Sequence, residues 1–161
     1  MKTRLYIYLA LFVLYILTIK KSIKKIMTEK DALKRIYDEY GLETARNVER
    51  MFRLETNHFK SKGYQLTNGA GMEAVMKNFP FGWSKKYFLG VDYSNDLVHM
   101  TDSGGRSVYF IKFATTYDGM KVIANWLQSH RVGNWYSLDP NKQKEYETKI
   151  SKINPIITNS L

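Results

Sequence analysis

The stretch ARNVERMFRLETNHFKSKGYQLTNGAGMEAV, from Ala45 to Val75, has the pattern of an amphipathic helix followed by a loop and a glycine turn. The apolar residues of its first part recur at the spacing i, i+3, i+6 and i+7, as Ala45, Val48, Met51 and Phe52. Glu55 continues the row that Val48 and Phe52 begin. We therefore predict a helix over residues 43–56, with a carboxylate where a leucine is expected.

A carboxylate on an apolar face is a candidate for acid catalysis. Removal from water disfavours the charged form, so the pKa of a glutamate rises from about 4.3 to about 6 or more. Such a group holds a proton near neutral pH and can donate it to a glycosidic oxygen as the bond to the sugar breaks. Glu55 is thus the candidate general acid. The alternative is a water-exposed glutamate at a frayed helix end.

The residues that follow Glu55 resemble the signature of soluble lytic transglycosylases in the lysozyme superfamily. Glu55-Thr56 is similar to a Glu-Ser at a helix end, and the stretch from Gly69 through Gly71 to Met72 is similar to a Gly-x-x-Gly-Leu-Met-Gln turn. The spacing of 17 residues from Glu55 to Met72 is also about that of the family. The resemblance implies that Glu55 is the catalytic acid and base, and that the glycine turn shapes the wall of a sugar-binding groove.

The chain departs from that signature at two positions. Thr56 replaces a serine, and Glu73 replaces a glutamine, so Glu73 is either a second acid in the cleft or a solvated side chain. The stretches FATTYDGMKVIANWL and GNWYSLDP are more similar to the related cell-wall endo-N-acetylglucosaminidases. There an aromatic cleft residue, commonly tyrosine, assists, which makes Tyr117 and Tyr136 candidates for sugar binding; the alternative for each is a core or surface tyrosine.

A second catalytic carboxylate is an open question. Glycosidases with two carboxylates place one on each side of the bond, and Asp92, Asp96 and Asp102 lie in or beside the predicted β region. Each also fits an ordinary turn. The transglycosylase resemblance implies that no second acid is needed, because the 6-hydroxyl of the sugar displaces the leaving group. Five aromatic residues are candidates for stacking on sugars or for the core: Trp83, Tyr87, Trp126, Trp135 and Tyr136.

The sequence predicts neither a metal nor another cofactor. Glu55 and His58 form a Glu-x-x-His pair, but a di-iron site needs a second such pair and two further glutamate-bearing helices. There is no cysteine, which excludes a thiolate nucleophile and a disulfide framework. No nucleotide-binding fingerprint is present.

The N-terminal region predicts a membrane anchor. Residues 5–19 are uncharged and apolar and are flanked by Lys and Arg. As a helix they span about 22 Å, which crosses a bilayer core of about 30 Å only if the flanking side chains extend outward. An uncleaved signal is the alternative. We predict an anchor at 1–21, a basic connector at 22–28 and one domain at 29–161. The formal charge of +10 is concentrated near the anchor, so lipid, and not nucleic acid, is the expected partner.

The predicted fold is α+β, lysozyme-like and mainly helical, with a small antiparallel β lobe and an N-terminal transmembrane helix. Helices are expected from residue 28 to 40, 43 to 56, 116 to 130 and 140 to 153, with a loop at 58–68, a short helix from residue 69 and a hairpin within 87–114.

Together these features favour an enzyme that cleaves peptidoglycan glycan strands, as a lytic transglycosylase or a muramidase. An endo-β-N-acetylglucosaminidase and a non-catalytic glycan-binding protein of an envelope machine or virion are the alternatives. The domain is expected to face the periplasm or cell wall, or to belong to a phage or to a virion that contains a membrane.

Overall fold

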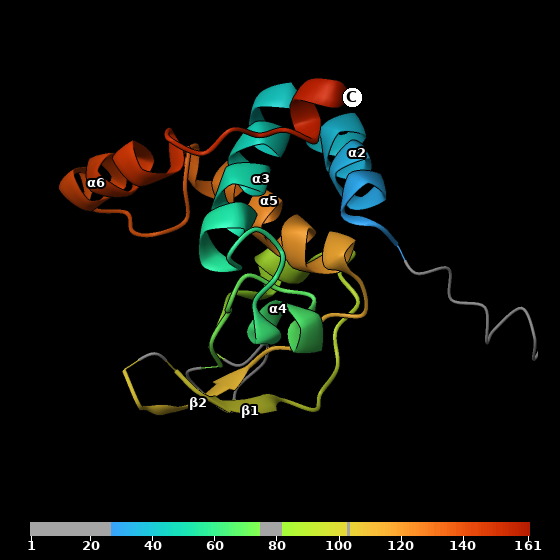
Figure 1. The fold of residues 1–161 in the computed structure, drawn as a ribbon, viewed down its shortest axis with the longest axis vertical. Helices are drawn as coiled ribbons and strands as arrows, with labels where there is room; N and C mark the ends of the chain where they lie inside the picture. The colour runs from blue at the N-terminus through green and yellow to red at the C-terminus, as the bar shows by residue number, and fades with distance from the viewer. Residues whose placement is uncertain (1–26, 75–81, 103) are drawn as a thin grey trace, which may run out of the picture.

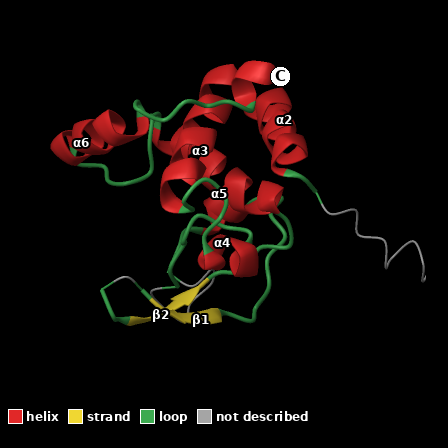
Figure 2. Ribbon diagram, in the orientation of Figure 1, coloured by secondary structure: helices red, strands yellow, loops and turns green. Residues whose placement is uncertain are grey.

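The computed structural model describes residues 27–74, 82–102 and 104–161. Within them the protein is mainly helical and carries a two-stranded antiparallel sheet, which makes the architecture α+β. Figure 1 shows α3 (Leu42–Glu55) near the middle, with α2 (Glu29–Tyr40) on one side and α6 (Pro140–Ile150) on the other. Figure 2 shows the strands together at one end of the molecule, away from the C-terminus.

The first two described helices begin and end where sequence signals predict. Thr28 caps α2 in a capping box with Asp31, and Gly41 separates α2 from α3 with a φ of 84° that suits glycine. The predicted helix over 43–56 is confirmed with each boundary one residue earlier, at Leu42 and Glu55.

The helix predicted over 116–130 is confirmed, and the helix predicted over 140–153 begins as predicted but ends at Ile150. α5 (Thr116–His130) is capped by the Thr115 side chain and is buried along most of its length. α6 begins with a proline at its first position and is capped by Asp139. The helix α5 packs on α2, on α3 and on the 3-10 helix η1 (Lys85–Phe88). These contacts form the apolar core, with Leu33, Ile36, Val48, Phe52, Met120 and Ile123 among its buried residues.

The predicted hairpin consists of β1 (Val98–Thr101) and β2 (Ser107–Phe110), paired in antiparallel register. The predicted helix from residue 69 is wrong for its described part, residues 69–74. Here the backbone is extended beside β2, because Ile111 N–H donates to Met72 O at 3.0 Å and Ala74 N–H donates to Tyr109 O at 2.7 Å. Residues 75–79 of that prediction lie outside the described residues.

The predicted loop at 58–68 contains a short helix, α4 (Lys62–Thr67). Ser61 caps it, and the Tyr64 side chain is buried, with its hydroxyl bonded to Glu29 and Thr116. Polar composition predicts a loop, but tertiary packing of Tyr64 stabilises a helical turn here.

No described helix is long and apolar enough to cross a membrane. The predicted anchor at 5–19 lies outside the described residues.

Candidate active site

Glu55 is the last residue of α3, and its carboxylate meets a tyrosine from the far end of the chain. The Tyr146 hydroxyl on α6 donates a hydrogen bond to Glu55 Oε1. Tyr146 is only 3% exposed. Burial raises the pKa of the Tyr146 phenol well above its usual range, and the hydrogen bond to Glu55 and the negative charge of that residue raise it further. Tyr146 therefore stays a neutral donor.

Glu55 itself is exposed, so the prediction that it is buried among apolar side chains is wrong. Val48 and Phe52, which precede it in the same row, are completely buried. The helix ends at Glu55, and a side chain in a last turn extends past the surface that the helix packs against. What restrains this carboxylate in the structure is the hydrogen bond from Tyr146.

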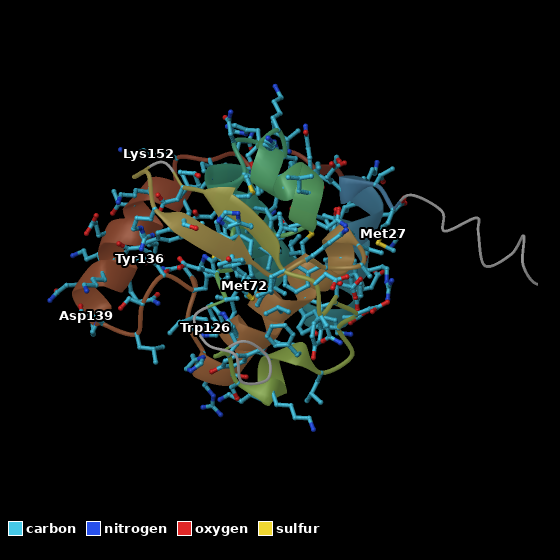
Figure 3. All side chains as sticks on the ribbon, turned by 90° about the horizontal axis from the view of Figure 1, so that it is seen from below. Met27, Met72, Trp126, Tyr136, Asp139 and Lys152 are labelled. Carbon is cyan, nitrogen blue, oxygen red and sulfur yellow. The ribbon has the colours of Figure 1, made fainter. Side chains whose placement is uncertain are left out.

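Tyr136 contacts Tyr146, the tyrosine whose hydroxyl bonds to Glu55. Its ring stacks on Tyr146 with 5.0 Å between centroids and 9° between planes, and 54% of Tyr136 is exposed. Figure 3 shows Tyr136 beside α6, close to the loop that leads to Asp139. Of the two predicted tyrosines, Tyr136 is the one that the fold brings to Glu55.

Two tryptophans extend this aromatic surface toward the glycine turn. Trp83 and Trp135 are partly exposed and stack with 6.2 Å between centroids. The Trp83 indole N–H donates to the Glu73 carbonyl at 2.9 Å, and Trp135 interacts with the Tyr146 hydroxyl. A line of contacts thus runs from Glu73 through both indoles to Tyr146. We call Trp83, Trp135, Tyr136 and Tyr146 the aromatic row.

The backbone after Glu55 makes an unusual left-handed turn. Asn57, His58 and Phe59 have φ values of 48°, 56° and 67°, although none is glycine. Each such residue costs about 1–2 kcal/mol. Thr56 stabilises the turn, because its buried hydroxyl donates to Phe52 O at 2.5 Å and accepts from Phe59 N–H at 2.8 Å. The Thr56 side chain therefore supplies a hydroxyl that shapes the end of α3.

The predicted groove residues of the glycine turn differ in their exposure. Gly69 and Met72 are buried, and a Cβ on Gly69 would lie 2.9 Å from the Phe113 ring. The close approach of the Phe113 ring therefore accounts for a glycine at position 69. Gly71 is exposed and has a φ of 77°. Glu73 is half-buried, and its carboxylate lies 3.9 Å from the Arg106 guanidinium.

Tyr117 does not join this site. Its hydroxyl donates to both carboxylate oxygens of Glu39, at 2.6 and 2.8 Å, and accepts from Lys121 at 2.8 Å. The Arg35 guanidinium lies over its ring at 3.6 Å. These contacts join α2 to α5, so the prediction of Tyr117 as a sugar-binding residue is replaced by a structural role.

Two of the three candidate second acids, Asp96 and Asp102, lie in turns. Asp102 accepts from the N–H groups of Gly104 and Arg106 and pairs with the Arg106 side chain at 2.7 Å, which closes the hairpin. Asp96 is exposed in a turn with Ser94, and Asp92 is exposed and paired through its backbone. The contacts of Asp96 and Asp102 are local, whereas the backbone of Asp92 bonds to Asp118 and Ala114.

The remaining aromatic candidates belong to the core. Tyr87 and Trp126 are each 8% exposed and contact the His130 ring.

Two hollows of the described surface lie apart from this site. They measure about 330 and 320 Å³ and lie on α2 and between α3 and the end of α5. In the ranges 27–74, 82–102 and 104–161, no three His, Asp or Glu side chains converge as a metal site would require.

The chain matches no protein-family model, no curated protein and no solved structure. Sequence reasoning missed Tyr146 as a site residue, because its place on the apolar face of α6 indicates only a core position. The resemblance to glucosaminidases, which implies a cleft tyrosine, was the signal that pointed toward this region.

Proposed function

We propose that this protein cleaves the glycan strands of peptidoglycan, as a lytic transglycosylase or muramidase with a lysozyme-like fold and with Glu55 as its general acid and base. The observation that carries the proposal is the hydrogen bond from Tyr146 to Glu55 at the end of α3. Helix, loop, β hairpin and later helices follow in the order that the motif predicts.

The aromatic row supports a saccharide as the ligand. Trp83, Trp135 and Tyr136 are partly or largely exposed, and their rings form flat apolar surfaces beside a carboxylate. Aromatic rings with a polar edge combine apolar contact area with hydrogen bonding. A glycan strand alternates hydroxyl-bearing edges with apolar ring faces, so it has the complementary chemistry.

The exposure of Glu55 sets a requirement on the mechanism. A saccharide bound over the carboxyl group displaces water from it, so the low-polarity environment that favours proton transfer forms with the substrate. Glu55 then donates its proton to the glycosidic oxygen as the bond from that oxygen to the sugar carbon breaks. The bond from Tyr146 to Oε1 restricts rotation of the carboxyl group and stabilises the carboxylate that remains.

A single acid favours the transglycosylase outcome. Asp96 and Asp102 serve turns, and the contacts of Asp92 are with Asp118 and Ala114, which leaves Glu55 to act twice. After the bond breaks, the carboxylate takes the proton of the sugar 6-hydroxyl, whose oxygen bonds to the anomeric carbon and closes an anhydro ring. In a muramidase, water takes the place of that hydroxyl.

The proposal includes a cellular setting. Residues 5–19 anchor the chain in a lipid bilayer, and the domain faces the periplasm or cell wall, or belongs to a phage or to a virion with a membrane. Detection of the protein in purified virions supports the viral setting, and its absence from them supports the host membrane.

Two alternatives have observations in their favour. The stretch GNWYSLDP is similar to cell-wall endo-N-acetylglucosaminidases, and it contains the exposed Tyr136. Both features favour an endo-β-N-acetylglucosaminidase. The exposure of Glu55 favours a glycan-binding protein without catalysis, in which the aromatic row holds the strand.

Digestion of purified peptidoglycan by the full-length protein, followed by mass spectrometry of the fragments, tests the proposal. Anhydro-muramic ends identify a transglycosylase, reducing muramic ends a muramidase and reducing glucosamine ends a glucosaminidase. Glu55→Gln is expected to abolish every product, whereas Glu147→Gln, at an exposed glutamate on α6, is expected to digest normally. No product from the unmodified protein contradicts the proposal, and sedimentation with peptidoglycan then identifies a binding protein.

A further inference from the structure

The one completely buried glutamate of α3 is Glu49, and it binds the C-terminal segment, residues 151–161. Its carboxylate accepts hydrogen bonds from the backbone N–H groups of Ile157 and Thr158, at 3.0 and 2.7 Å, and from the Thr158 hydroxyl. Arg53 Nε donates to the same carboxylate at 2.7 Å. A buried charge is stable only with such partners, and removing one leaves the others unsatisfied.

The C-terminal segment is also the connection that holds one end of α6. Figure 1 shows α6 beside the main body, with the chain returning from it across α3 toward α2. Along this path Arg50 Nε donates to the Ile153 carbonyl at 3.3 Å, and Pro155 is buried. The helix α6 packs on α3 through the buried residues Tyr146 and Ile150. The bonds of Glu49 therefore hold the far end of the segment that follows α6.

The same network reaches the turn that follows Glu55. Arg53, the partner of Glu49, lies over the Phe59 ring at 5.4 Å and contacts His58 Nδ1 at 3.5 Å. Two chains of contacts thus lead from Glu49 toward Glu55, one through Arg53 to the turn after α3 and one through the C-terminal segment to α6.

We infer that Glu49 and Thr158 are positioning residues for Glu55: by fixing the C-terminal segment to α3 they place α6 so that the Tyr146 hydroxyl reaches the Glu55 carboxylate. The consequence for catalysis rests on the proposed function, whereas the consequence for Tyr146 is independent of it. Neither residue touches the substrate.

Substitution at Thr158 in the full-length protein tests the inference. Thr158→Val keeps the shape of the side chain and removes the hydroxyl donor, and Thr158→Ser keeps the donor. Thr148→Val is the matched control, because Thr148 is exposed on α6. Thr158→Val is expected to lower kcat for peptidoglycan cleavage roughly ten- to a hundredfold, the cost of misplacing a catalytic group by about 1 Å. The serine and control variants are expected to keep the kcat and KM of the unmodified protein.

A second readout follows Tyr146 without substrate. In protein with ¹³C at the tyrosine Cζ, the Tyr146 signal is assigned by its loss in Tyr146→Phe. Thr158→Val is expected to move that signal toward the value of free tyrosine, and Thr148→Val is expected to leave it in place. An unmoved signal in Thr158→Val overturns the inference, even where kcat falls. If the unmodified protein releases no product, the proposed function fails while this signal still decides the inference.

A folding defect does not leave the inference untested. Should circular dichroism show that Thr158→Val is unfolded, Ile157→Pro replaces it in both measurements. Proline lacks the N–H that Glu49 accepts, and the Ile157 φ of −70° suits proline. The same shift of the Tyr146 signal is expected, and its absence overturns the inference.

Discussion

Tyr146 and Glu55 are 91 positions apart in the sequence, and in the fold the tyrosine hydroxyl donates a hydrogen bond to the glutamate carboxylate. The donor is buried and the acceptor is exposed. A buried donor has few alternative positions, so it orients a carboxylate that would otherwise rotate freely in water. This relationship makes the end of α3 the candidate active site.

Tyr146→Phe removes that donor and keeps the ring stack on Tyr136. Since a hydrogen bond to a charged group contributes about 1.5–3 kcal/mol, we expect the rate of peptidoglycan cleavage to fall by about tenfold or more. Release of soluble fragments over time measures it. Tyr109→Phe, at an exposed tyrosine of the hairpin, is the control. Equal rates for Tyr146→Phe and the unmodified protein contradict the assigned role.

Thr56→Val removes the hydroxyl at the centre of the left-handed turn. The Phe59 N–H then loses its acceptor in a partly buried place. We expect the free energy of unfolding to fall by about 1–3 kcal/mol, as measured by urea denaturation. Thr56→Ser keeps the hydroxyl and is expected to retain most of the stability. If the serine variant is as unstable as the valine variant, the methyl group and not the hydroxyl stabilises the turn.

Gly119→Ala tests the packing of α5 against the loop before the glycine turn. A Cβ at position 119 would lie 2.3 Å from the Asn68 carbonyl oxygen, which is backbone and cannot rotate away. We expect a loss of at least about 1–3 kcal/mol in the free energy of unfolding, measured by thermal denaturation.

Gly63→Ala is the matched control for that change. Gly63 lies within α4, and a Cβ there meets its nearest atom at 3.9 Å. Because alanine is favoured over glycine in a helix by up to about 1 kcal/mol, this variant is expected to be as stable as the unmodified protein or more so. Similar losses for both variants would contradict the packing argument.

Glu39→Gln is expected to change how stability depends on pH. Burial raises the pKa of Glu39, but hydrogen bonds from Tyr117 and Lys121 and the charges of Lys121 and Arg35 lower it more, so the pKa lies below its ordinary value of 4.5. A lowered carboxylate pKa adds stability above the unfolded-state value, and that stability is lost as the pH falls through the folded-state value.

The stability of the unmodified protein should therefore fall more steeply between about pH 5 and pH 3 than that of Glu39→Gln. The difference is expected to be below about 1 kcal/mol, because the side chain is partly exposed to water. Urea denaturation at several pH values measures it, with Glu147→Gln as the control. Parallel curves of unfolding free energy against pH for the unmodified protein and Glu39→Gln would contradict this prediction.

Local patterns predict much of the fold because local forces determine those elements. The caps at Thr28 and Asp139, the proline that begins α6 and the turn closed by Asp102 all depend on residues within a few positions. The helix α4 was missed for the opposite reason, since its stability depends on Tyr64, whose hydroxyl partners lie 35 and 52 positions away.

The site could be predicted only in part. A motif located Glu55, and a resemblance located Tyr136, but the spacing could not show which acid of α3 is buried. Glu49 lies at i+4 from Ala45 and at i−3 from Phe52, on the same buried face as Val48. This spacing indicates a buried position for Glu49. Its partners lie 108 and 109 positions later, in a segment without a motif.

The separation of Glu49 from Thr158 has a consequence for biosynthesis. A ribosome releases the N-terminal part of a chain first, so α3 emerges together with Arg53 but well before Ile157 and Thr158, which complete the partners of the Glu49 carboxylate. During that interval Glu49 must remain hydrated, which keeps water in contact with the nascent core. Final compaction of the helices, and with it the orientation of Glu55, therefore waits for the end of translation of this domain.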